Sequence, residues 1–89
     1  MKGIITVLGK DRVGIIAKVC VYLSENGINI LDISQTIVQG YFNMMMIVDI
    51  ENAGKRFEAL VPELEALGSE IGVHIKLQHE DIFNAMHRV

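Results

Sequence analysis

The sequence predicts an α+β domain in which two helices cover one face of a four-stranded antiparallel sheet. Apolar residues alternate with a period of two in the segments expected to be strands, and with a period near 3.6 in the two expected to be helices. Glycine or Asn-Gly separates most of these segments, which follow one another in the order βαββαβ. The 89 residues suffice for one domain and are too few for two.

The first half of the chain contains a strand, a helix and the start of a second strand. Residues 3–8 are a β-branched run bounded by glycine, which is typical of a buried central strand. Residues 14–26 are predicted to form a helix that Asp11 caps and Asn26-Gly27 ends. Its apolar stripe is expected to comprise Ile16, Val19, Cys20 and Leu23, with Lys18, Tyr22 and Glu25 mostly on the other side.

The middle of the chain is predicted to be a pair of strands joined by a hairpin. Residues 28–38 and 41–50 alternate on either side of Gln39-Gly40, and a bulge or twist is expected near residues 30–32, where the alternation changes phase. In the second of these strands, Met44, Met45 and Met46 alternate across the sheet. They therefore do not converge as metal ligands, and core packing is the better interpretation.

The second helix is expected from Phe57 to Ile71, ending at Gly72, with a kink or break near residues 58–61 caused by Pro62. A last strand begins at Val73. Residues 80–87 are predicted to form a short C-terminal helix that docks through its apolar side, which comprises Ile82, Phe83 and Met86.

Right-handed crossovers in both β-α-β units give the strand order 2-3-1-4 of a ferredoxin-like sandwich, with both helices on one face. The other face of the sheet is then partly open. The strand over residues 28–38 lies at an edge and is long and apolar, and natural proteins usually cover or pair such an edge.

Composition excludes several classes of function. The formal net charge is −3, which argues against nucleic acid as the partner. Cys20 is the sole cysteine, so neither an intrachain disulfide nor a cysteine-based zinc site is expected. The apolar N-terminal stretch is interrupted at residues 9–12, too soon for a signal peptide or a membrane span, and a cytoplasmic location is expected.

Two segments carry a family resemblance: GKDRVGI over residues 9–15 and ENGINI over residues 25–30. Together they resemble the first β-α-β unit of ACT domains, in which an Asp-x-x-Gly turn opens the first helix and Gly-x-Asn-Ile begins the second strand. Val13 departs from the pattern, since many ACT domains have proline there. DISQT over residues 32–36, the three methionines and QHEDIFNAMHR over residues 78–88 look like the small stand-alone ACT proteins designated UPF0237.

The resemblance covers residues 1–89 and implies a single ACT domain. It implies a regulatory module, not an enzyme, that binds an amino acid or a similar small molecule at a homodimer interface and acts through a separate protein. The residues themselves suggest neither a cofactor loop nor a metal site, so no cofactor or metal is expected. The implied ligand-binding residues are Lys10, Asp11, Arg12, Val13, Gly14, Asn29 and Ile30. Four polar residues of the apolar edge strand either line the interface between subunits or are solvated, and the edge position favours an interface role: Asp32, Ser34, Gln35 and Thr36.

The residues alone leave alternatives open at both implied binding segments. The turn over residues 10–14 either holds a carboxylate on free N–H groups or is an ordinary strand-to-helix turn. Asn29 either contacts an amino-acid head group or simply leaves a turn. Cys20 on the apolar stripe is expected to be a buried structural thiol. The three histidines, His74, His79 and His87, lack the i, i+4 spacing of a shared metal site.

Three other functions compete with ligand binding. A regulatory subunit without a ligand of its own would use the same interface. An RNA-binding domain shares the βαββαβ order, but it needs sheet-face aromatics and basic charge that are scarce here. A small acylphosphatase-like enzyme would need Arg12 and Asn29 around a glycine-rich cradle that the loop lacks.

Overall fold

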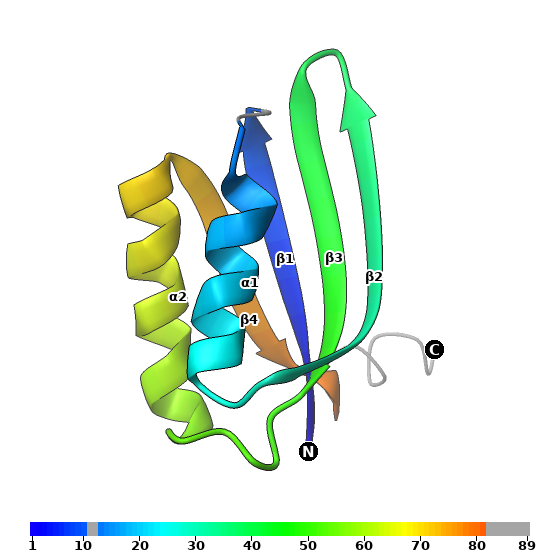
Figure 1. Cartoon of the computed structure of the whole chain (residues 1–89). Coiled ribbons are helices and arrows are strands. Elements are labelled where there is room, and N and C mark those ends of the chain that lie inside the picture. Colours follow the sequence, from blue (N-terminus) through cyan, green and yellow to red (C-terminus); the bar gives the residue numbers. More distant parts are fainter. Residues whose placement is uncertain (11–12, 82–89) are drawn as a thin grey trace.

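The computed structural model describes residues 1–10 and 13–81. Their elements are β1 (Lys2–Lys10), α1 (Ile15–Glu25), β2 (Asn29–Val38), β3 (Tyr41–Asp49), α2 (Phe57–Ile71) and β4 (Val73–His79). The strands form one antiparallel sheet in the order β2-β3-β1-β4, and both helices lie on the same face of it (Figure 1). This confirms the predicted ferredoxin-like fold class and strand order. The predicted helix over residues 80–87 falls largely outside the described residues.

The core lies between the helices and the sheet. Its fully buried side chains come from β1, β3 and both helices, and comprise Ile5, Val7, Val19, Leu23, Met44, Met46, Val48, Leu60 and Leu64. Met45 points to the opposite face and is 42% exposed, so the predicted alternation of the three methionines is confirmed.

The predicted apolar stripe of the first helix was partly wrong. Its buried residues are Ile15, Val19 and Leu23, whereas Ile16 is exposed and Cys20 is half-buried. Apolar residues occupy adjacent positions along this helix, so a period of 3.6 fits two stripes, and the position of the sheet selects one of them. The N-cap residue is Gly14, which makes no side-chain capping bond. Asp11, the expected cap, lies outside the described residues.

Of the kink or break expected near residues 58–61, the break does not occur, because α2 is continuous through Pro62. Proline removes one hydrogen bond, here to the carbonyl of Glu58, and at an interior helix position it typically costs about 3 kcal/mol. Leu60 and Leu64 on either side are fully buried, and their packing holds the helix together across the missing bond.

The β2–β3 hairpin reaches beyond the helices, so the outer part of β2 is uncovered on both faces (Figure 1). The expected bulge lies between Ile30 and Asp32, and positive φ angles at Gln39 and Gly40 form the predicted tight turn. Leu31, Ile33, Ile37 and Val38 are each between 44% and 60% exposed. The structure therefore confirms a long, apolar edge strand. Within residues 1–10 and 13–81, no helix is long and apolar enough to cross a membrane.

Candidate functional site

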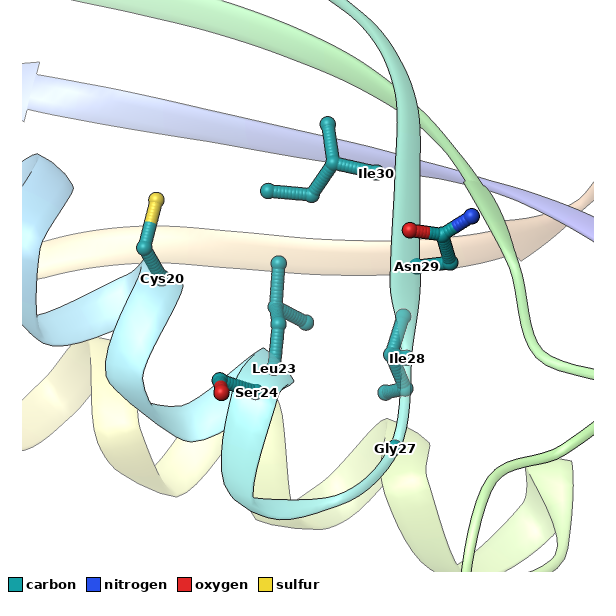
Figure 2. A pocket seen from close by; sticks show the side chains of 7 residues that line it. All are labelled: Cys20, Leu23, Ser24, Gly27, Ile28, Asn29 and Ile30. Carbon is teal, nitrogen blue, oxygen red and sulfur yellow. The ribbon is translucent and has the colours of Figure 1, made fainter.

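A pocket opens between the C-terminal end of α1 and the start of β2, with a volume of about 420 Å³ (Figure 2). Seven residues line it: Cys20, Leu23, Ser24, Gly27, Ile28, Asn29 and Ile30. Leu23 and Ile28 are buried, and Ser24 and Asn29 are exposed, so the pocket has an apolar floor and a polar rim. None of the lining residues carries a formal charge.

The tight corner after α1 fixes the shape of this pocket. The backbone N–H of Ile28 donates to the carbonyl of Leu23 at 2.9 Å, and that of Gly27 donates to Ser24 at 3.2 Å, which satisfies helix-end carbonyls. Gly27 adopts φ 71°, a left-handed conformation that favours glycine. A Cβ atom there would lie 2.9 Å from the carbonyl oxygen of Asn52. Glycine is thus required at this corner both for its conformation and for space.

The α1 wall of the pocket is tied to α2 by a polar cluster on the helix layer. The Tyr22 hydroxyl donates to Oε1 of Glu63 at 2.8 Å, and the Lys55 ammonium donates to both oxygens of the same carboxylate. Partial burial, and then the Glu63 carboxylate, raise the pKa of Tyr22 well above its usual range. The hydrogen bond from Lys55, followed by that from Tyr22, lowers the pKa of Glu63. The cluster thus links α1 to α2 through side-chain hydrogen bonds.

The turn before α1 is the second candidate binding segment. Gly14 has φ 89°, and a Cβ atom there would meet nothing within 4 Å, so space around it is open. Val13 is fully exposed, and Lys10 is exposed at the end of β1. Asp11 and Arg12, the other two candidate residues of this turn, lie outside the described residues.

One chain does not bring the two candidate segments together. Lys10 pairs with Tyr41, which pairs with Val38, so the turn lies at the hairpin end of the sheet. Asn29 pairs with Asp49 at the other end. The 10 residues of β2 separate these ends by about 30 Å at ~3.3 Å per residue. A binding site that uses both segments therefore requires a second subunit.

Neighbouring residues of β2 differ in direction at its start. Ile30 points towards Cys20 on α1, whereas the amide of Asn29 points away from that helix (Figure 2). The pairing of Ile30 with buried Val48 places it on the helix side of the sheet. Ile30 thus presents its side chain to the pocket, and Asn29 contributes mainly backbone.

The candidate interface residues of β2 fall on both faces of the strand. Asp32, Ser34 and Thr36 pair with Ile47, Met45 and Asn43, so they lie on the face away from the helices. Gln35 lies on the helix side, because it pairs with buried Met44. All four are exposed at the outer edge of the sheet.

The histidines show no metal-binding arrangement in the part of the chain that the structure describes, where no three His, Cys, Asp or Glu side chains are close enough to share an ion. His74 is exposed on β4. The ring of His79 stacks edge-on against Phe57, with 5.9 Å between centroids, and its Nδ1 accepts from the N–H of Asp81. His87 lies outside the described residues.

Sequence reasoning did not assign Cys20, Leu23, Ser24 or Ile28 to a site, yet they form most of the pocket. Cys20 was expected to be buried and is half-buried at the pocket wall. The available signal was the i, i+4 spacing of Cys20 and Ser24 on the last turn of a helix that ends at Gly27. That spacing places both on one side of the helix, but only the fold shows that β2 runs beside it.

Comparisons with known proteins show that the chain is similar to ACT domains in sequence and in fold. A family model described as ACT domain matches residues 3–78. A UPF0237 protein of Bifidobacterium longum is 64% identical over 88 residues, covering 99% of this chain and 98% of its own length. The structure of an ACT domain protein from Streptococcus pneumoniae is 46% identical with a TM-score of 0.83, each chain being covered to 93%. The ligand-free regulatory subunit of aspartate kinase from Thermus thermophilus is 28% identical with a TM-score of 0.66, covering 88% of this chain and 50% of that one.

Proposed function

The chain belongs to the ACT domain family, and on that premise we propose that it is a regulatory domain that binds an amino acid at the interface of a homodimer. The family assignment supports a regulatory role for this domain over a catalytic one. The observation that carries the proposal is the separation of its two candidate binding segments within one chain.

A homodimer whose two-fold axis passes beside the middle of β2 would bring the two candidate binding segments together across the interface. Two copies of β2 paired antiparallel would place Asn29 of the partner subunit beside Val38 of the first. Val38 is two strands from Lys10 across the sheet, a distance of about 10 Å at ~4.8 Å per strand. Each dimer would then hold two sites, each built from the turn of one subunit and the β2 start of the other.

The exposed surface of β2 supports such pairing. Its backbone is paired to β3 alone within the described chain, and Leu31, Ile33 and Ile37 expose apolar surface beside it. Pairing would satisfy the free backbone groups and bury these side chains, which removes the aggregation risk of a long apolar edge. Ile16 on the adjacent side of α1 is also exposed and would extend the contact.

Thermal unfolding with a panel of amino acids tests the proposal. A ligand at 100 times its Kd stabilises the folded state by about 2.7 kcal/mol, which is a readily measured rise in melting temperature. We expect a rise with one or a few amino acids, and a dimer by light scattering at micromolar concentration. Ile37→Lys, at the exposed edge, should give a monomer that loses the rise, whereas Val21→Lys on the opposite side of α1 should keep both.

Three results would contradict the proposal. A wild-type protein that is monomeric at micromolar concentration would rule out the proposed dimer interface along β2. A dimer that no amino acid stabilises would point to a regulatory subunit without a ligand, and tight RNA binding at moderate salt would point to the RNA-binding alternative.

A further inference from the structure

We infer that the ligand's side chain is uncharged and aliphatic, and that it lies in the pocket between α1 and β2. This rests on the proposed function and narrows it to the class of amino acids that includes valine, leucine and isoleucine. The inference starts from the lining of the pocket, in which Leu23, Ile28 and Ile30 supply apolar surface and Ser24 is the one hydroxyl side chain (Figure 2).

Within one chain, a charged ligand side chain would lie in this pocket without an oppositely charged residue. No carboxylate, ammonium or guanidinium lines it, so a charge that the partner subunit covers there would lose its hydration and gain no ion pair from this chain. The end of α1 adds a second argument against an anion, because the helix dipole is negative there and no basic residue lies in its last turn. The helix-end carbonyls already accept backbone N–H groups from Gly27 and Ile28, so they offer little to a cation.

The dimer would close the pocket with a further apolar group. A register that pairs β2 over its whole length sets Ile30 opposite Ile37 of the partner subunit. Residues opposite each other in a pair of strands project to the same face of the sheet. Ile30 and Ile37 both lie on the helix side, since they pair with buried Val48 and Phe42. Ile37 is 57% exposed in one chain, and as the lid of the partner's pocket it would be covered.

The arrangement gives each residue a distinct role in selection. Leu23 and Ile28 form the floor, and Cys20 and Ser24 line the helix side. Ile30 lines the strand side, with Ile37 of the partner subunit beside it as the lid. A branched aliphatic side chain fills such a space by contact alone, whereas aspartate or lysine would bring a charge into it.

The test compares leucine, valine and isoleucine with aspartate, glutamate, lysine and arginine, each added to the full-length protein at equal concentration in a thermal unfolding assay. We expect the aliphatic amino acids to raise the melting temperature and the charged ones to leave it unchanged. Ser24→Asp should weaken leucine binding by about tenfold or more by placing a carboxylate at the pocket rim. Val21→Asp, on the side of α1 that faces α2, is the matched control and should bind leucine as the wild type does.

Ile37→Ala provides a second variant at an exposed position, where loss of fold is not expected. It should retain the dimer and weaken leucine binding by about tenfold, since the lid loses most of its apolar contact. Stabilisation by a charged amino acid in place of the aliphatic ones would overturn the inference while leaving the proposed function intact. If no amino acid stabilised the protein, both the inference and the proposed function would be rejected. An equal loss of leucine affinity in the Ser24→Asp and Val21→Asp variants would show that the ligand does not contact the pocket.

Discussion

Replacing Gly27, at the corner that shapes the pocket, is predicted to destabilise the protein. In Gly27→Ala, an L-residue must adopt φ 71°, which costs roughly 1–2 kcal/mol. The new Cβ atom would also lie 2.9 Å from the carbonyl oxygen of Asn52, and because that oxygen belongs to the backbone it cannot turn aside. Such overpacking costs typically about 1–3 kcal/mol. The free energy of unfolding should therefore fall by about 2–5 kcal/mol.

Gly40→Ala is the control that separates the two costs. Gly40 has φ 81°, close to that of Gly27, but a Cβ atom there would meet nothing within 4 Å. Only the conformational cost applies, so this variant should lose about 1–2 kcal/mol. Both substitutions reduce the freedom of the unfolded chain by the same amount, and that effect cancels in the comparison.

Urea denaturation followed by circular dichroism, at one protein concentration, measures both losses. Gly27→Ala should be less stable than Gly40→Ala by about 1–3 kcal/mol, which corresponds to a difference of at least about 4 °C in melting temperature for a domain of this size. Equal losses in the two variants would refute the claim that contact with Asn52 constrains the corner.

Three further predictions concern the helix layer. The pKa of Glu63 is lowered in the folded state, so its contribution to stability is present above the usual glutamate pKa and is lost as pH falls through the folded-state pKa. Glu63→Gln should therefore flatten the acid limb of a plot of melting temperature against pH. The pKa of Tyr22 is raised, so its contribution is fully present below pH 10.0 and declines as pH rises further; Tyr22→Phe should flatten the alkaline limb, and an unchanged limb would contradict the hydrogen bond to Glu63. Leu64→Ala removes a fully buried side chain and should cost about 2–5 kcal/mol in urea denaturation, whereas half-buried Leu67→Ala should cost less.

Strand order, hairpin and bulge were predictable because each depends on local pattern and on the handedness of connections. The change of phase at Ile30–Asp32 is visible in the sequence, and the structure places the bulge there. Burial around α1 was less predictable. Tyr22 was expected mostly on the outer side, but it is half-buried and bonded to Glu63, 41 residues further along the chain. A partner so distant in sequence leaves no periodic signal.

The candidate site was predictable only for the two segments that match a sequence motif. The turn near Gly14 and the start of β2 are recognisable in the sequence, but their placement at opposite ends of the sheet follows from the register of three strands. The direction of Asn29 away from α1 follows from pleating and from the bulge that comes after it (Figure 2). The pocket itself depends on the corner at Gly27, which brings two separate elements side by side.

The separation of the two binding segments also links ligand binding to assembly. If each site is built from the turn of one subunit and the β2 start of the other, the ligand binds the dimer and not the monomer. Mass action then requires the ligand to strengthen the dimer as well as to raise the melting temperature. Dilution should lower the melting temperature of the free protein, and a saturating ligand should reduce that dependence. The Ile37→Lys variant, expected to be monomeric, tests this link. If a ligand stabilised it as strongly as the wild type, the ligand would have to bind within one chain, where the strand register keeps Lys10 and Asn29 apart, and the two-subunit site would be wrong.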